Sequence, residues 1–457
     1  MRIFPADRCV IVATLICAGG FASATQPPDP VASDSNFNTA MGSGVLFSLT
    51  TGVNNTGAGY VALYYNTTGD QNTAFGGSAL AFDTTGTDNA AFGFNALAYN
   101  ISGDDNTAVG IQALQANTAG NLNTGAGFRS LYTNTNGNDN AALGAYSLTS
   151  NTTGSGNAAL GEGALYNNTS GNGGTAAGAG ALEYNTTGNY NTAVGYLTLS
   201  SNTTGGFTTS VGAYSLEANT TGGYDTAFGA YSLPDNTTGT GNTAFGYAAL
   251  RSTTIGNNNI GFGYQAMYSN ATGSSNIAMG YQAGYYATGS YNIEIGSEGA
   301  RGDEATIRLG TEGTQTITYI AGITGTQVTG AAVYVTSSGQ LGVQASSERY
   351  KTAIASMGAS TKKLQALRPV TFRLKSDPHD VVQYGLIAEE VDKVYPELVI
   401  RDSTGKIQGV HYEELAPMLL NEVQQQAAEI SDLKKIVGEL RAGMVKLQSR
   451  GELAALR

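Results

Sequence analysis

Residues 72–88 read NTAFGGSALAFDTTGTD, and residues 89–105 repeat the pattern as NAAFGFNALAYNISGDD. Both follow the consensus N-T-A-h-G-x-x-A-L-x-x-N-T-T-G-x-x, where h is an apolar residue. Glycine recurs in this register every 17 residues from Gly42 to Gly280, and Leu follows four residues later in nearly every unit. Repetition at one fixed period is the signature of a repeat architecture. The period of this stretch therefore decides the fold class.

A unit of this length is too short for a pair of helices, and it has no apolar stripe at helical spacing. We expect two short strands of about five residues in each coil, joined by two turns, with the Ala and Leu positions facing inward. The Asn-Thr-Thr-Gly turn supplies side-chain hydrogen bonds and a glycine able to take positive φ. The sequence thus predicts a mainly β protein with a parallel β-solenoid (β-roll) over residues 38–297, a rod of about 70 Å at the usual strand spacing.

The repeats resemble the heads of trimeric autotransporter adhesins and related fibre proteins, whose N-x-A-h-G units form a left-handed parallel β-roll. This resemblance covers residues 38 to about 291. It implies a homotrimer, which the period by itself does not show. A narrow coil lined mostly with Ala buries little apolar surface, so association of several chains is physically reasonable.

Composition excludes several functions. The chain has 63 Gly and only 12% charged residues, with a formal net charge of −12. Residues 1–345 carry a net charge of −13 and residues 346–457 a net charge of +1. An acidic surface with so few Lys and Arg is poorly suited to binding nucleic acid or an anionic membrane. Acidic residues in the repeats are sparse and scattered, and His does not occur there, so we expect no glycosidase pair, no metal site and no cofactor. The acidic residues considered are Asp83, Asp105, Glu162, Glu183 and Asp225.

Two other features of the repeats have a functional and a structural interpretation. The N-x-T sequons are potential glycan acceptors in a eukaryotic secretory pathway, but turn chemistry explains them without glycans. Tyrosines at variable positions, such as Tyr247 and Tyr264, could stack on sugars of a host-surface or glycan receptor, whereas packing within the protein is the simpler explanation.

Residues 1–24 combine two arginines, a short apolar run and a small-residue site, which is typical of a secretory signal peptide. Cleavage after Ala24 would leave residues 25–37 as a linker. Both cysteines lie inside the signal, so the mature chain has none. A lipidated Cys17 is the alternative, although Ile16 is bulky where that signal needs a small residue. We expect a secreted or cell-surface protein without an integral membrane segment in the mature chain.

Residues 298–345 leave the period and alternate Thr, Ile and Val between glycines, which predicts a β neck. At Ser346 the composition changes abruptly towards Lys, Arg, Glu and helix formers, and Lys351 is the first lysine of the chain. This change marks the start of a smaller α+β domain over residues 346–457.

Three motifs occur in this last domain in a fixed order. The first is S-S-x-R-x-K at its start, formed by Ser346, Ser347, Arg349 and Lys351. The second is YGLIAEEVDKVYPELV, residues 384–399, and the third is VHYEELAPMLLNEVQQQ, residues 410–426. With these motifs the domain resembles the self-cleaving intramolecular chaperone of endosialidases, phage tail spikes and bacterial fibre proteins, which is classed as a serine peptidase. Glu389 stands where that family often has Gln.

The resemblance implies cleavage between Ala345 and Ser346, with Ser346 as nucleophile and Lys351 as its general base. A serine hydroxyl needs such a base, and lysine serves as one only when neutral, which requires desolvation. Arg349 is a candidate for binding the developing oxyanion or for pairing with a carboxylate. The alternative is that Lys351 is an ordinary exposed lysine of a new domain. We expect a single-turnover self-cleaving endopeptidase and no other enzymatic activity; His379 and His411 are interpreted as structural.

The C-terminal residues predict a coiled-coil helix over about 416–450. Apolar residues recur there at alternating spacings of three and four, which is a heptad seam: Ile430, Leu433, Val437, Leu440, Met444 and Leu447. The residue types in the seam favour a dimer, whereas Gln426 and the resemblance favour a trimer. The overall prediction is a trimeric adhesin-like fibre with a self-removing assembly chaperone. The alternatives are an adhesin with a non-cleaving trimerisation domain and, less favoured, a polysaccharide-degrading fibre.

Overall fold

The computed structural model describes residues 32–320, 332–336, 339–375, 379–402 and 404–455. The chain forms two compact units, one ending at Thr316 and the other beginning at Ile317. The predicted signal peptide, residues 1–24, lies outside the described residues, and so does most of the predicted linker.

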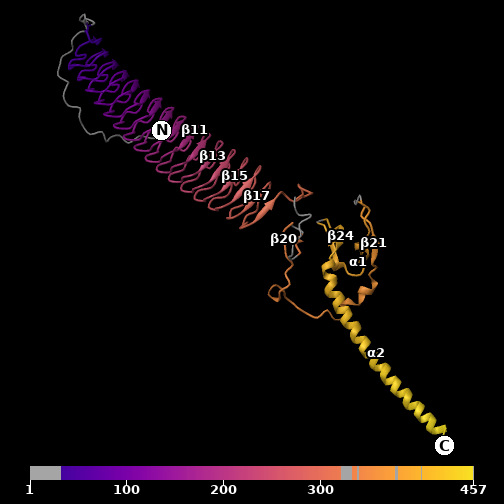
Figure 1. Ribbon diagram of the computed structural model, residues 1–457. Coiled ribbons are helices and arrows are strands. Elements are labelled where there is room, and N and C mark those ends of the chain that lie inside the picture. Colours follow the sequence, from indigo (N-terminus) through magenta and orange to yellow (C-terminus); the bar gives the residue numbers. More distant parts are fainter. Residues whose placement is uncertain (1–31, 321–331, 337–338, 376–378, 403, 456–457) are drawn as a thin grey trace. The chain divides into compact units, whose positions relative to one another are not determined.

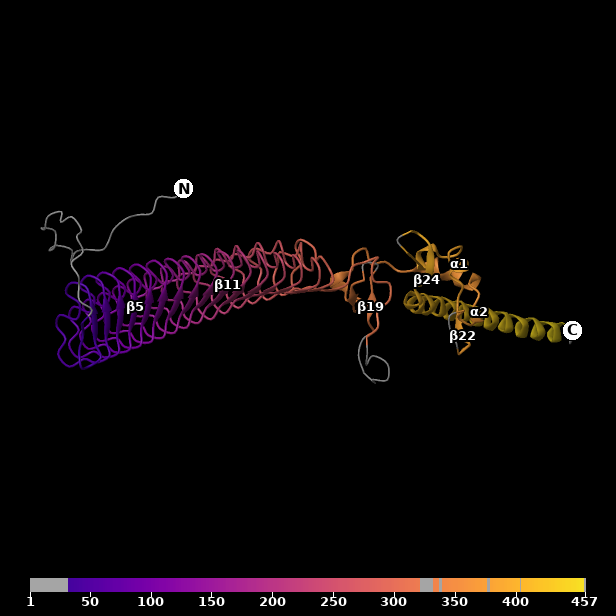
Figure 2. The same cartoon turned by 90° about the horizontal axis from the view of Figure 1, so that it is seen from above.

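The first unit is a solenoid in which each coil contributes one strand to a single parallel sheet (Figures 1 and 2). At its start β1, Ala32–Ser33, pairs antiparallel with β2, Thr39–Met41. The parallel strands that follow are β3 Thr56–Ala58, β4 Thr73–Phe75, β5 Ala90–Phe92, β6 Thr107–Val109, β7 Thr124–Ala126, β8 Ala141–Leu143, β9 Ala158–Leu160, β10 Thr175–Ala177, β11 Thr192–Val194, β12 Thr209–Val211, β13 Thr226–Phe228, β14 Thr243–Phe245, β15 Ile260–Phe262, β16 Ile277–Met279, β17 Ile293–Ile295 and β18 Ile307–Leu309. The predicted parallel β-solenoid is confirmed.

Each strand pairs with the next in strict register, as Thr73 does with Ala90. The last two coils are shorter, since Ile277 pairs with Ile293 and Ile293 with Ile307. The parallel ladder therefore continues to Leu309, inside the segment that the sequence assigns to the neck.

The expectation of two five-residue strands per coil is wrong. Each coil has a single strand of three residues, and the rest is turns and bends. The reason lies in the backbone of the non-glycine residues around the recurring Leu: Ser78 and Leu80 have φ values of 57° and 49°. A residue in the left-handed region cannot continue an extended strand. At Leu80 the strain of this conformation is offset by burial of the side chain and by a hydrogen bond of 3.0 Å from the Leu80 N–H to the Ala96 carbonyl in the next coil.

The solenoid interior is formed by one row of Ala from the strands and one row each of Ala and Leu from the opposite side. Ala74, Ala79 and Leu80 are fully buried, and the same positions are buried throughout the rod. This confirms the predicted inward direction of the Ala and Leu positions. Stacking identical coils lets each Leu pack on the Leu of the coils above and below, which compensates for the narrow core of one coil.

Two buried ladders of asparagine flank this apolar core. In one, the backbone N–H of Asn106 donates to Asn89 Oδ1 at 3.0 Å, and Asn106 Nδ2 donates to the carbonyl of Gly120 at 2.8 Å. In the other, Asn117 Nδ2 donates to Asn100 Oδ1 at 2.8 Å and to the same Gly120 carbonyl at 2.9 Å. Asn100 begins the sequon Asn-Ile-Ser, and both ends of its side-chain amide form hydrogen bonds inside the protein, which supports the turn interpretation over a glycan acceptor.

Both glycine series lie against the backbone of the next coil, but only one of them has a positive φ. Gly76 has a φ of +138°, and a Cβ there would lie 2.4 Å from the carbonyl oxygen of Gly93 in the next coil. Gly69, in the Asn-Thr-Thr-Gly turn, is outside the left-handed region, so the prediction of positive φ for that turn glycine is wrong. A Cβ on Gly69 would still lie 2.3 Å from the Gly86 carbonyl oxygen. Close approach of the next coil explains this second series.

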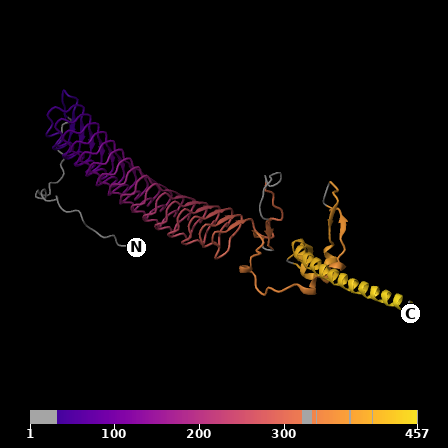
Figure 3. The same cartoon turned by 60° about the horizontal axis from the view of Figure 1, so that its bottom comes forward.

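The second unit is α+β. Its elements are β19 Tyr334–Val335, β20 Leu341–Gly342, the 3-10 helices η1 Glu348–Tyr350, η2 Gly358–Ala366 and η3 Pro396–Leu398, β21 Val370–Phe372, β22 Gln383–Gly385, α1 Ala388–Val391, β23 Val399–Arg401, β24 Ile407–Val410 and α2 Tyr412–Ala455. Three antiparallel hairpins pair β19 with β20, β21 with β22 and β23 with β24. Helix α2 ends the described chain (Figure 3). The small core of the second unit contains Val391, Tyr395, Leu398, Val399 and Val410.

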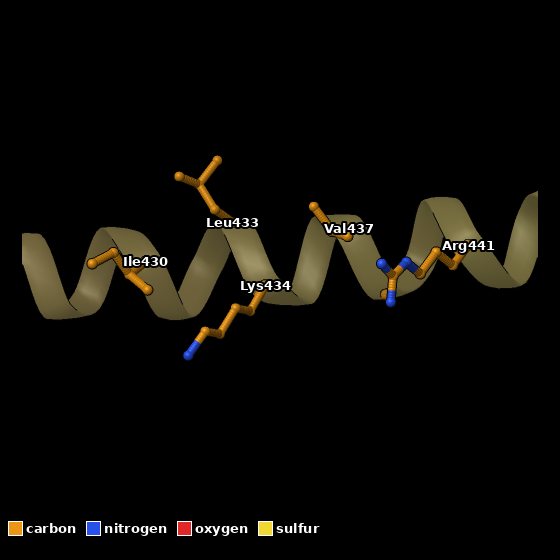
Figure 4. A pocket seen from close by; sticks show the side chains of 6 residues that line it. Ile430, Leu433, Lys434, Val437 and Arg441 are labelled. Atoms are coloured by element: carbon orange, nitrogen blue, oxygen red, sulfur yellow. The ribbon is translucent and has the colours of Figure 1, made fainter.

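Much of helix α2 has no apolar cover. The seam residues Ile430, Leu433 and Val437 are all exposed, and Figure 4 shows them on the helix surface beside Lys434 and Arg441. Among the described residues, no helix has both the length and the apolar character that crossing a membrane requires.

Candidate functional site

The sequence-predicted dyad lies in the second unit after strand β20, on either side of one 3-10 turn. Two backbone hydrogen bonds of 3.0 Å form helix η1: the Tyr350 N–H donates to the Ser347 carbonyl, and the Lys351 N–H donates to the Glu348 carbonyl. This turn folds the chain back on itself. As a result Lys351 Nζ lies 3.5 Å from Ser346 Oγ. The structure therefore brings together two side chains whose spacing of five residues does not by itself guarantee contact.

The surroundings of the dyad are open. Ala345, Ser346 and Lys351 are all exposed to solvent in the single chain. An exposed ammonium group remains hydrated, and hydration favours its charged form, which cannot accept a proton from a hydroxyl. One chain thus supplies the contact between nucleophile and base but not the dry environment that would activate the base.

Arg349 points to a different partner. Its guanidinium carbon lies 4.6 Å from the centre of the Tyr350 ring, within the range of a cation–π contact. The expected alternatives for Arg349, an oxyanion or a carboxylate, stay predictions. His411 contacts Glu413 through Nδ1 at 2.8 Å near the start of helix α2, in keeping with its structural interpretation.

Sequence reasoning missed the polar contacts that attach η2 to helix α2. Glu422 is buried and accepts hydrogen bonds from Thr361 Oγ1 at 3.1 Å and from Gln365 Nε2 at 3.2 Å. Asn421 Nδ2 donates to Thr361 Oγ1 at 2.7 Å and to the Gly358 carbonyl at 2.9 Å. These bonds hold the segment after the dyad on the helix that carries the seam. The signal in the sequence was a glutamate one helical turn after the apolar residues Met418 and Leu419.

Within the solenoid, two aspartates replace asparagine in the buried ladders. Asp83 accepts a hydrogen bond from Asn100 Nδ2 at 2.8 Å, and burial raises its pKa to about 8. Asp225 accepts one from the backbone of Asn242 at 2.7 Å, and burial raises its pKa to about 7. They are about 40 Å apart along the rod at the usual strand spacing, so they cannot act as one catalytic pair. The parts of the chain that the structure describes hold no group of three residues able to bind a metal ion.

The tyrosines form ladders along the rod. Tyr247 and Tyr264 are stacked with ring centres 5.5 Å apart, and Tyr264 and Tyr281 with centres 5.4 Å apart. Because each ring covers the face of its neighbour, these faces are not open to a sugar ring. Contact between coils is the role that this geometry supports.

The class defined by these features is a β-solenoid protein with a separate C-terminal domain. Residues 346–400 match the model of the peptidase family described as the chaperone of endosialidase. The matched segment begins at Ser346 and contains both dyad residues. Searches of the curated proteins and of the solved structures found no match. Solenoid and matched segment together support a tail-fibre-like protein with a C-terminal chaperone domain.

Proposed function

We propose that this chain is a secreted, homotrimeric surface fibre whose C-terminal domain aligns three copies and then removes itself by cutting between Ala345 and Ser346. The observation that carries the proposal is the 3.5 Å contact between Lys351 Nζ and Ser346 Oγ at the start of the segment that matches the chaperone of endosialidase family.

The chemistry follows from the roles of the two side chains. Neutral Lys351 accepts the proton of Ser346 Oγ, and this oxygen forms a bond to the carbonyl carbon of Ala345. The bond from that carbon to the Ser346 nitrogen breaks, and Lys351 returns the proton to the departing amine. Water then hydrolyses the ester, which leaves a carboxylate on Ala345 and restores the Ser346 hydroxyl.

Assembly completes this site. Lys351 is exposed in the single chain, while the seam of helix α2 is uncovered. Association of three helices through the seam would bring neighbouring subunits close to the dyad and remove water from Lys351, favouring its neutral form. Cleavage would then wait for assembly. This order suits a repeat rod, because identical coils can pair one repeat out of register, and a clamp at one end prevents such slippage.

Release of residues 346–457 makes assembly irreversible, because a rod that unfolds afterwards no longer carries the domain that aligned it. Export would use residues 1–24 as signal peptide, and a host-surface or glycan receptor would bind the exposed rod. No nucleic acid partner is proposed for a rod of this charge. An adhesin that keeps its C-terminal domain is the alternative.

The test is the dependence of cleavage on chain concentration in the purified full-length chain, followed by intact mass. We expect a break between Ala345 and Ser346 that forms faster at higher concentration, because association is what removes water from the dyad. A fully assembled chain that stays intact supports a C-terminal domain that remains attached instead.

A further inference from the structure

The outward face of the solenoid sheet carries one continuous apolar stripe. The third residue of every strand from β2 to β18 is Ala, Val, Leu, Ile, Met or Phe, and we call this row the outer stripe. Its larger members are well exposed: Phe75 is 38% exposed, Leu160 57% and Phe262 48%. The first residue of each strand, beside the outer stripe, is Thr, Ala or Ile. No charged residue interrupts either row.

The outer stripe and the row beside it together form a face large enough for an interface. With strands about 4.8 Å apart and about 10 Å long, this face offers about 800 Å² per chain, the area that one partner gives to a stable interface. The outer stripe makes up about half of this face, which is the size of the apolar patches of about 300–600 Å² that often mark functional surfaces on monomers. No residue described in the first unit buries the large side chains of the outer stripe.

The charge of the rod restricts what can cover this stripe. Residues 1–345 have a net charge of −13, so two rods repel through most of their surface. The outer stripe and the row beside it contain no charged residue, so two such rods can contact each other along this face without charge repulsion between the contacting side chains. A second copy also matches the stripe in length and period, coil for coil, as a rotation axis along the rod requires.

We propose that the outer stripe is the surface through which copies of this rod pack side by side, parallel and in register. The inference rests on the proposed fibre and adds to it what holds the copies together after residues 346–457 are released. Helix α2 sets the register, and the outer stripe keeps it.

Cysteine cross-linking tests this in the full-length chain. The sequence has only Cys9 and Cys17, so both are replaced by Ala and one cysteine is introduced by Leu160→Cys. The matched control is Thr187→Cys, an exposed position on the Asn-Thr-Thr-Gly turn. A short bismaleimide is added, and linked chains are counted on a denaturing gel beside native mass spectrometry.

We expect Leu160→Cys chains to link at least tenfold more than Thr187→Cys chains. A mixture of Leu160→Cys and Phe262→Cys chains should link like with like, because the coils are in register. Two results in an assembled chain would overturn the outer stripe as the contact surface while leaving the proposed fibre intact. One is a Thr187→Cys control that links as well as Leu160→Cys, and the other is preferential linking of unlike positions. A monomer by native mass spectrometry would overturn both.

Charge placed in the outer stripe gives a second test that does not depend on a linker. Phe245→Glu should separate the cleaved rods into monomers, whereas Tyr224→Glu, at an exposed position outside the stripe, should not. Circular dichroism checks that both variants fold. Cleaved Phe245→Glu rods that fold and remain associated would contradict the proposal.

Discussion

Lys351 Nζ lies 3.5 Å from Ser346 Oγ, and both side chains are open to solvent. The contact is local, because one 3-10 turn between the two residues creates it. The environment is not local, since the residues that the structure describes leave the lysine exposed to water. The proposed cleavage, which needs neutral lysine, would therefore depend on a surface from a second copy of the chain and so on association.

Replacing the two buried aspartates by the ladder residue should stabilise the rod at alkaline pH. The folded-state pKa of Asp83 is about 8, above its ordinary value of 3.8, so its stabilising contribution is complete below pH 4 and is lost as pH rises through 8. Asp83→Asn should raise the free energy of unfolding at pH 9 by about 2–5 kcal/mol and change it little at pH 4. Thermal unfolding of the two chains at both pH values measures this.

Asp88→Asn is the matched control, because it removes the same charge from an exposed position five residues away. It should leave the pH dependence of unfolding as it is. If Asp83→Asn and Asp88→Asn behave alike, overall charge and not the buried carboxyl governs the effect.

The coil glycines should differ in how well they tolerate a methyl group. Gly144 has a φ of +134°, and a Cβ there would meet the Gly161 carbonyl oxygen at 2.6 Å, whereas Gly163 has a φ of +65° with open space around it. We expect Gly144→Ala to cost about 2–4 kcal/mol of unfolding free energy and Gly163→Ala about 1 kcal/mol. Chemical denaturation compares them, and equal losses would show that φ alone sets the requirement for glycine.

Removing the buried Glu422 should loosen η2 from helix α2. Glu422→Ala leaves the buried Thr361 hydroxyl without this acceptor, at a cost of about 1–3 kcal/mol. Glu429→Ala, an exposed change on the same helix, is the control. Hydrogen exchange of residues 358–366 should accelerate in the first variant only; unchanged exchange would mean that apolar contacts alone hold the segment.

Charging the seam should block both association and cleavage. Leu433→Lys places an ammonium where apolar helices would meet, and we expect a chain that is cut at least tenfold more slowly. Ser431→Lys adds the same charge to another exposed position of the helix and should assemble and cleave normally. Rapid cleavage of a monomeric Leu433→Lys chain would show that the dyad needs no second subunit.

The solenoid was predictable because its determinants recur in every coil. A period of 17 residues with Ala and Leu at fixed places identifies stacked coils and the inward rows. The number of strands per coil was not predictable, because Leu80 adopts a left-handed backbone that a bulky residue rarely takes, and only packing between coils stabilises it. At the candidate site, the resemblance carried by the three motifs indicates the dyad, which the spacing of five residues alone does not, and the exposure of the dyad and the Thr361–Glu422 contact depend on the folded chain.

The most direct measurement is intact mass of the purified full-length chain beside its Ser346→Ala and Lys351→Ala variants, with Lys362→Ala as a lysine control. Native mass spectrometry reports association in the same samples. We predict that the parent chain and Lys362→Ala yield a rod ending at Ala345 and a fragment of residues 346–457, while both dyad variants assemble and stay whole. A parent chain that assembles into trimers and stays whole, or a Lys351→Ala chain that is cut as fast as the parent, would contradict self-cleavage by this pair.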